Sequence, residues 1–219
     1  MTVPSHPAQP RSVIVFGATG SVGSLAVQSL LDEGHAVTAF ARRPERLGVQ
    51  HARLRRIASD ALDFESVSAA MPGHDAAIVT LGAGSALRSR IRSEGTLNVI
   101  RAMQVHGVPR LVVQSTLGAH ESWGNLDFWW KRVMFGALLR PVHRDHELQE
   151  QLVRASGLDW TIVRPSAFVD GPATGAFRVG FAPVERNLKL RIARADVAEF
   201  LARQLCERAW SGRAVGIST

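Results

Sequence analysis

The sequence predicts an α/β fold built on a single doubly wound parallel sheet with helices on both faces. Two patterns predict it: a short apolar segment runs through a glycine-rich turn into a helix, and similar apolar segments alternate with helical ones along the chain. The chain has 219 residues, of which 46% are apolar and 21% charged, as expected of a globular protein with one sizeable core. We therefore expect one domain over residues 11–219, substrate pocket included, and a disordered tail over residues 1–10.

The chain is expected to begin with a strand, a glycine turn and a helix. Residues 12–16 form a continuous apolar run that ends at a glycine, which is typical of a strand buried on both faces. Residues 21–33 then repeat apolar residues at helical spacing, with Leu25, Leu30 and Leu31 on one side. A glycine follows directly and ends this helix.

The same alternation continues through the middle of the chain. A second strand is expected over residues 36–40 and a weaker third strand over residues 53–58. Residues 64–71 form a short helix, because its pattern ends at Pro72 and Gly73.

Further strands and helices complete the predicted sheet. They are expected in the order strand 76–81, helix 89–106, strand 111–114, helix 145–155, strand 158–163 and helix 195–208. Strands that alternate with helices of this length are joined in parallel by right-handed crossovers. Ligands of such sheets bind beyond the carboxyl ends of the strands.

A glycine motif lies directly after the first strand, in the segment VIVFGATGSVG. Its first glycine permits the tight turn, its second lets the backbone approach a diphosphate, and its third lets the helix pack against the strand. Free amides of the first helical turn then point at phosphate oxygens. Glycines also end strands for structural reasons, but in this context they predict dinucleotide binding. The expected contacts are Gly17, Thr19, Gly20, Ser21, Val22 and Gly23.

The end of the second strand predicts which dinucleotide binds. NAD-binding proteins usually place an acidic residue there to accept the ribose hydroxyls, whereas this chain has Arg42 and Arg43. Two guanidinium groups complement the additional 2′-phosphate of NADP(H), which we therefore prefer over NAD(H). In the alternative, both arginines simply open the next short helix in solvent.

Later strand ends add to the predicted cofactor site. Asp60 follows the third strand and is placed to meet the adenine amino group, although Asp60 or Asp63 can equally cap a helix. Small residues after the fourth strand let the backbone approach the cofactor. The remaining predicted cofactor contacts are Ala61, Leu81, Gly82, Ala83 and Pro165.

Composition excludes several other classes of protein. The lone Cys206 forms no internal disulfide and builds no cysteine zinc site, so a reducing cytoplasm fits best. Neither a signal peptide nor a stretch of about 18 uninterrupted apolar residues is evident, so we expect neither export nor a membrane span. The net charge is +7, and all but two of the 26 basic residues are arginines spread along the chain. Because the basic residues lack interleaved aromatics and no recognition motif appears, nucleic acid is not an expected partner.

The motifs together resemble a known family. GATGSVG at 17–23, SEGTLNVIRAMQVHGVPRLVVQST at 93–116, DHELQEQLVRASGLDWTIVRPS at 145–166 and GPATGAF at 171–177 resemble atypical short-chain dehydrogenase/reductases. Within them the chain is most similar to the NmrA-like NAD(P)H-binding group and to biliverdin-IXβ reductase, also called flavin reductase. The resemblance implies a Rossmann-like fold and NADP(H) held by the glycine turn, Arg42 and Asp60.

The same resemblance implies two candidate catalytic residues. Ser115 corresponds to the serine beside the nicotinamide, and His146 to a histidine of the Asp-His segment. The chain departs from the family at Ala167, which replaces a second histidine, and over the longer stretch 120–143. Both departures lie where substrate should bind, so bilin specificity is not transferred.

The chain contains no tyrosine, which removes the usual acid of short-chain dehydrogenases. Hydride transfer to an electron-poor conjugated acceptor needs less help, because the product anion is delocalised. Ser115 would orient an acceptor carbonyl or the carboxamide, and His146 would donate a proton or contact an anion. The alternatives are a small strand-end residue for Ser115 and a helix-start residue for His146. A metal at His143 and His146 is not expected, since nothing obvious supplies further ligands.

Residues 127–139 form an aromatic stretch that covers most of a helical circumference. Ordinary core packing, a lid over an aromatic substrate, a homodimer interface and a membrane-surface contact are all compatible with it. We favour the lid among the functional alternatives. The predicted function is an NAD(P)H-dependent reductase of a small planar or conjugated acceptor such as a flavin, quinone, bilin or polycyclic aromatic. The alternatives are an NmrA-like NADP-binding sensor without turnover and a pathway-specific natural-product reductase.

Overall fold

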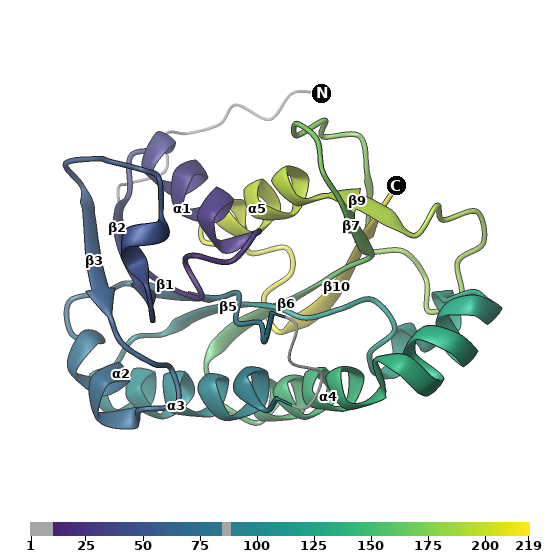
Figure 1. Ribbon diagram of the computed structural model, residues 1–219, viewed down its shortest axis with the longest axis horizontal. Helices are drawn as coiled ribbons and strands as arrows, with labels where there is room; N and C mark the ends of the chain where they lie inside the picture. Colours follow the sequence, from purple (N-terminus) through teal and green to yellow (C-terminus); the bar gives the residue numbers. More distant parts are fainter. Residues whose placement is uncertain (1–10, 85–88) are drawn as a thin grey trace.

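The computed structural model describes residues 11–84 and 89–219, and its centre is an eight-stranded sheet of order β3-β2-β1-β4-β5-β6-β10-β8 (Figure 1). The strands of this sheet are β1 Ser12–Phe16, β2 Ala36–Ala41, β3 Leu54–Ala58, β4 Ala76–Val79, β5 Arg110–Gln114, β6 Asp159–Pro165, β8 Arg178–Val179 and β10 Arg213–Ser218. A second sheet pairs β7 Ala167–Val169 with β9 Arg191–Ala193. The predicted residues 1–10 tail lies outside the described residues.

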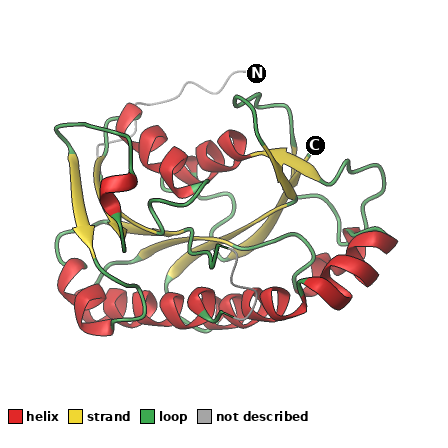
Figure 2. Cartoon of the chain, viewed as in Figure 1, coloured by secondary structure: helices red, strands yellow, loops and turns green. Residues whose placement is uncertain are grey.

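Helices cover both faces of the main sheet, as predicted. Helices α1 and α5 pack together on one face, and α2, α3 and α4 form a row on the other (Figure 2). Their bounds are α1 Gly23–Asp32, α2 Phe64–Ala70, α3 Ile91–His106, α4 Arg140–Arg154 and α5 Arg194–Arg203. The fold is therefore the Rossmann-like α/β class. No helix of the described residues is long and apolar enough to cross a membrane.

Strand β1 shows why the sheet needs both helical layers. Its residues alternate between the two hydrophobic cores, with Val13 and Val15 in one and Ile14 and Phe16 in the other. All four side chains are fully buried. A strand that is apolar on both faces is stable only when both faces are covered. Because β1 pairs with β2 on one side and β4 on the other, the chain order reverses at its carboxyl end. Ligands of open α/β sheets bind at this switch point.

Several predicted boundaries are wrong, by up to about one and a half turns of helix or by a few strand residues. Helix α4 begins at Arg140 rather than at Asp145, because Pro141 fits the first helical turn, where its missing N–H costs nothing. Helix α5 ends at Arg203 and strand β4 at Val79. Leu25 does not share the buried side of α1 with Leu30 and Leu31, since Leu25 is 37% exposed.

The carboxyl-terminal strands were not predicted. Strand β10 pairs in parallel with β6 and antiparallel with the short edge strand β8, so the main sheet is not purely parallel. Strand β10 carries Gly216 and begins at an exposed arginine, which weakens its apolar pattern. Strands β7 and β9 have three residues each, too few for a clear period.

Candidate cofactor and substrate site

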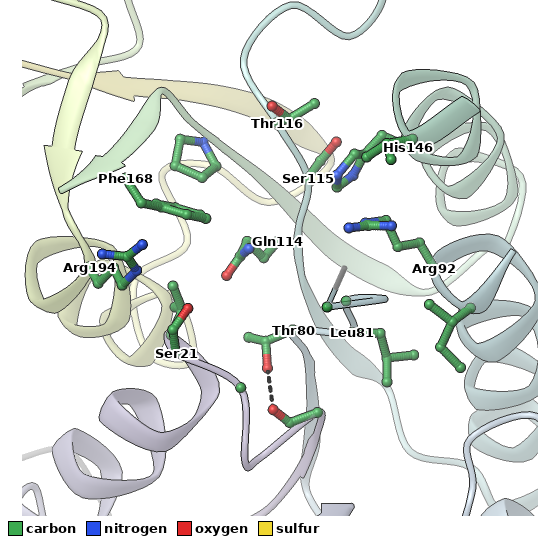
Figure 3. A pocket seen from close by; sticks show the side chains of 18 of the residues that line it. Ser21, Thr80, Leu81, Arg92, Gln114, Ser115, Thr116, His146, Phe168 and Arg194 are labelled. Carbon is green, nitrogen blue, oxygen red and sulfur yellow. Dashed lines mark hydrogen bonds between the residues drawn. The ribbon is translucent and has the colours of Figure 1, made fainter. Parts of the chain in front are cut away.

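One cavity of about 730 Å³ lies beyond the carboxyl ends of β1, β2, β4, β5 and β6 (Figure 3). This volume lies within the range of about 300–1,000 Å³ that is usual for small-molecule sites. All of the predicted site residues except Gly23 and Ala83 line it. They are Gly17, Thr19, Gly20, Ser21, Val22, Arg42, Arg43, Asp60, Ala61, Leu81, Gly82, Ser115, His146 and Pro165.

The glycine turn leaves no room for side chains on its inner side. Gly17 has a φ of +83°, and a Cβ there would lie 2.6 Å from the carbonyl oxygen of Thr80. A Cβ on Gly23 would collide with the carbonyl oxygen of Gly17, so Gly23 serves helix packing and does not line the cavity. The hydroxyl of Thr80 donates to the carbonyl oxygens of Phe16 at 3.1 Å and Gly17 at 3.3 Å. The turn is therefore held tightly between β1 and β4.

The start of α1 is suited to an anion. Its first turn carries no acidic residue, and the N-cap residue Val22 makes no side-chain capping bond. Helix N-termini with free amides attract phosphate through those amides and the helix dipole. A diphosphate group fits this turn, which no side chain fills.

Cations border the end of the cavity next to β2. Arg42, Arg43 and Arg46 all line it, and Arg42 and Arg43 are exposed to solvent. Asp60 is the only carboxylate among the described residues that line the cavity. Its Oδ1 accepts a hydrogen bond of 3.0 Å from the Leu62 amide.

Two predicted details of this region change. Asp63, not Asp60, caps helix α2, since its carboxylate accepts from the Glu65 amide at 3.2 Å. Ala83 is half-buried and lies outside the residues that line the cavity. Strand β4 ends at Val79, earlier than predicted, and the two neighbours of Ala83, Gly82 and Gly84, both line the cavity.

Ser115 lies at the end of β5 and is held by a buried ion pair. Its hydroxyl donates a 2.6 Å hydrogen bond to Glu150 of α4, which is fully buried. Glu150 in turn accepts hydrogen bonds of 2.8 and 2.5 Å from Arg164 of β6, itself 2% exposed. Burial favours the neutral form of Arg164, but hydrogen bonds and the charges of Glu150 and Glu121 outweigh it and raise the arginine pKa.

This arrangement fixes what Ser115 offers to a ligand. A serine hydroxyl has one hydrogen and two acceptor lone pairs. Because the hydrogen is donated to Glu150, the oxygen faces the cavity as a hydrogen-bond acceptor. Sequence reasoning missed Glu150 and Arg164, although both lie in the 145–166 motif, since nothing in their spacing shows that they meet.

His146 lies on α4 beside Ser115 and is 7% exposed (Figure 3). Burial, followed by the charge of Arg92, lowers the pKa of His146 to about 3. The ring is therefore neutral at pH 7 and carries one N–H hydrogen. Its Nδ1 is buried without a hydrogen-bond partner.

His143, one of the two histidines at helical spacing, is engaged within the protein. The Nε2 of His143 lies 3.0 Å from the Gly118 carbonyl oxygen, where it makes a hydrogen bond inside the protein. Among the described residues, no group of three or more His, Cys, Asp or Glu side chains is placed to hold a metal ion.

The far end of the cavity is apolar and aromatic. It is lined by Leu117, Leu126, Trp130, Phe135, Leu139 and Val142, whereas Phe168 lines the cavity beside Arg194. Three of these residues come from the aromatic stretch 127–139, most of which forms a π-helix over Trp130–Leu138. Other aromatic residues of the stretch are exposed to solvent, since Phe128 is 76% exposed and Trp129 is 59% exposed.

Two further arginines line the cavity that sequence reasoning missed. Arg92 lies near the start of α3, and Arg194 at the start of α5 has its guanidinium 5.5 Å from the Phe168 ring centroid. A helix-start arginine is ordinary in sequence, and only the packing of α3 and α5 around the sheet edge turns these two inward.

The fold and the cavity together define the class of dinucleotide-binding oxidoreductases with a Rossmann-like domain. The family described as NAD(P)H-binding matches residues 17–208, and the chain belongs to this family. It therefore binds a nicotinamide cofactor. Its fold is shared by a Veillonella parvula structure described as a short-chain dehydrogenases/reductase in complex with NADP, which aligns with a TM-score of 0.79 and 16% identity, covering 95% of this chain and 94% of that one.

Individual relatives match along most of the chain. A Bacillus subtilis protein named as an uncharacterized sugar epimerase is 28% identical over 217 residues, which cover 94% of this chain and 93% of that protein. A Streptomyces griseus (4-alkanoyl-5-oxo-2,5-dihydrofuran-3-yl)methyl phosphate reductase is 28% identical over 211 residues, covering 94% and 67%. The solved structure of ChuY, an anaerobilin reductase from Escherichia coli O157:H7, aligns with a TM-score of 0.74 and 25% identity, covering 94% and 96%.

Proposed function

We propose that this protein is an NADPH-dependent reductase that transfers a hydride to a small conjugated acceptor such as a flavin, quinone, bilin or polycyclic aromatic. One observation carries the proposal: a single cavity joins the glycine turn and its neighbouring arginines to an aromatic wall, with Ser115 between them. We further propose that residues 11–219 act as one domain that contains both ends of this cavity. A cytoplasmic location stays a prediction.

The cofactor end fits a phosphorylated dinucleotide. Gly17, Gly20 and Ser21 of the glycine turn line the cavity, where their backbone could contact a diphosphate, and glycine at 17 lets the turn pack against the Thr80 backbone. Arg42 and Arg43 follow β2 directly, where NAD-binding proteins usually carry an acidic residue. Guanidinium groups complement a 2′-phosphate, so we propose that NADPH is preferred over NADH. When bound, NADPH supplies a hydride from C4 of its nicotinamide ring.

At the acceptor end, the protein would hold a flat ring and exclude water. Trp130 and Phe135 supply aromatic surface for stacking, and their neighbours Leu117, Leu126 and Leu139 are aliphatic. The Ser115 oxygen would accept a hydrogen bond from an N–H group of the acceptor or of the nicotinamide carboxamide, because the Ser115 hydroxyl hydrogen is donated to Glu150. We propose that positioning of this kind, rather than a strong acid, is what the site contributes.

The choice of acceptor follows from the acids that the site lacks. The chain has no tyrosine, and the pKa of His146 is lowered to about 3, so the imidazolium form is scarce at neutral pH. A simple ketone or sugar would need such an acid, whereas a conjugated ring delocalises the added electrons and can be protonated later by water. The bilin and furanone reductases among the relatives are named for conjugated substrates, which supports the same class.

A second candidate is an NADP-binding sensor that does not turn its cofactor over. The same scarcity of acids favours it, since the hydroxyl hydrogen of Ser115 is already engaged. Tight NADPH binding without oxidation across flavins, quinones and bilins would favour the sensor over the reductase.

The test compares NADPH oxidation by the wild type with that of Arg42→Glu, using flavin and quinone acceptors. Loss of a charge-assisted contact of about 1.5–3 kcal/mol should lower kcat/KM for NADPH by about 10- to 150-fold and leave NADH nearly unchanged. Arg90→Glu is the matched control, because its side chain is 81% exposed and lies outside the cavity. An unchanged ratio of NADPH to NADH in Arg42→Glu would refute the cofactor assignment.

A further inference from the structure

Two polar groups on one wall of the cavity are buried without hydrogen-bond partners. They are Nη1 of Arg92 and Nδ1 of His146. Figure 3 shows both side chains beside Ser115, on the side of the cavity across from Ser21 and Arg194. Buried polar groups without partners are uncommon in folded proteins, so this pair calls for an explanation.

The carboxylate nearest to Arg92 is already engaged elsewhere. Asp145 accepts hydrogen bonds from the amides of Arg92 at 3.2 Å and Ser93 at 3.1 Å, and from the Ser93 hydroxyl at 2.5 Å. Its Oδ2 lies 3.7 Å from Nη1 of Arg92, which is beyond hydrogen-bond distance. Asp145 therefore holds the start of α3, while the guanidinium of Arg92 keeps hydrogens to donate.

The charge of Asp145 only partly offsets the cost of burying the Arg92 guanidinium. The side chain of Arg92 is 13% exposed, and burial lowers its pKa more than the charge of Asp145 raises it. A guanidinium removed from water without a full set of acceptors is costly, and an anionic ligand would offset that cost. His146 adds a second polar atom that is nine-tenths buried and can donate from a neutral ring.

We propose that Arg92 and His146 form a subsite for an anionic oxygen group, phosphate or carboxylate, carried by the acceptor that the reductase reduces. This inference rests on the proposed function and narrows its substrate class to conjugated rings that bear an anionic side group. Arg92 would supply the planar donors that fit phosphate and carboxylate oxygens, and His146 a further N–H donor.

The position of the subsite assigns it to the acceptor and not to the cofactor. In the proposed function the phosphates of the dinucleotide would bind at the glycine turn and at Arg42, which line the cavity near the start of α1 and the end of β2. Arg92 and His146 instead adjoin Ser115, and the apolar residues Leu139 and Val142 precede His146 along the same cavity wall. An anionic group here would anchor a flat molecule whose ring lies against that wall.

FMN and riboflavin form a matched pair of probes, because they share the same ring and differ by one phosphate. Their dissociation constants are measured by flavin fluorescence with protein saturated with NADP+. We expect wild-type protein to bind FMN about 10- to 150-fold more tightly, as one or two charge-assisted contacts would give. Arg92→Met should bring the two flavins to equal affinity, and Arg92→Lys should retain part of the preference. Biliverdin and its dimethyl ester test a carboxylate in the same way.

The control variant is Arg90→Met, which removes an exposed charge two residues away and should leave the FMN preference intact. Thermal unfolding of each variant shows whether it is folded. If Arg92→Met does not fold, the FMN preference of Arg92→Lys provides the test instead. Equal binding of both flavins by wild type, no binding of any probe, or a preference that survives Arg92→Met would overturn the subsite. The subsite would also be overturned if Arg92→Met lost as much affinity for NADP+ as it lost for FMN. Failure of wild type to bind NADP+ would instead overturn the proposed function.

Discussion

Replacing Gly17 by alanine should damage the glycine turn far more than the same change at Gly34. Both glycines have positive φ values, +83° and +93°, so alanine pays a similar conformational penalty of about 1–2 kcal/mol at either position. A Cβ at Gly34 meets nothing within 4 Å, whereas one at Gly17 lies 2.6 Å from the Thr80 carbonyl oxygen. Relief of this backbone overlap should cost about 1–3 kcal/mol more.

Urea denaturation of the two variants measures this difference directly. We expect the free energy of unfolding to fall by about 1–2 kcal/mol in Gly34→Ala and by about 2–5 kcal/mol in Gly17→Ala. Movement of the turn should also weaken NADPH binding in Gly17→Ala but not in Gly34→Ala, because Gly34 follows the opposite end of α1. Equal destabilisation by the two changes, with NADPH affinity retained in both, would refute this account of the turn.

Three further predictions follow from the buried groups around the cavity. Glu150→Leu should lower the free energy of unfolding, measured in urea, by about 3–5 kcal/mol, because Arg164 loses its buried partner. The double variant Glu150→Leu/Arg164→Met should lose clearly less stability, because it leaves no unpaired buried charge. His146 has an ordinary pKa of 6.5 but about 3 in the folded chain, so below pH 6.5 protons bind the unfolded chain preferentially and stability falls. Between pH 7 and pH 5 this histidine should lower the free energy of unfolding by about 2 kcal/mol, and His146→Asn should lack this loss. The same pH dependence of unfolding in wild type and His146→Asn would contradict the prediction. Trp130→Ala should raise KM for a flat acceptor while NADPH affinity stays unchanged, as steady-state kinetics and a binding titration can show.

The cofactor end of the site could be predicted from sequence because it depends on local features. A glycine motif between a strand and a helix fixes the turn through backbone geometry, and the parallel fold brings successive strand ends to one edge. Arg42 and Asp60 accordingly line the cavity with Gly17, although they are distant along the chain. Ala83 does not line the cavity, although Gly82 and Gly84 on either side of it do.

The acceptor end depends on long-range contacts that no local pattern encodes. The partner of Ser115 is Glu150, 35 residues away, and the next partner is Arg164 on another strand. Arg92 looks like any exposed helix-start arginine until α4 packs beside α3 and buries it. The composition of residues 127–139 shows that this stretch is unusually aromatic. It does not reveal the π-helix, and therefore does not reveal which residues line the cavity and which are exposed to solvent.

Equilibrium titration of the purified wild-type protein with NADPH and with NADH, followed by the nicotinamide fluorescence, tests the central claim most directly. We expect saturable binding of one nucleotide per chain, with NADPH bound more tightly than NADH because Arg42 and Arg43 would contact its 2′-phosphate. Absence of binding by both nucleotides would contradict it.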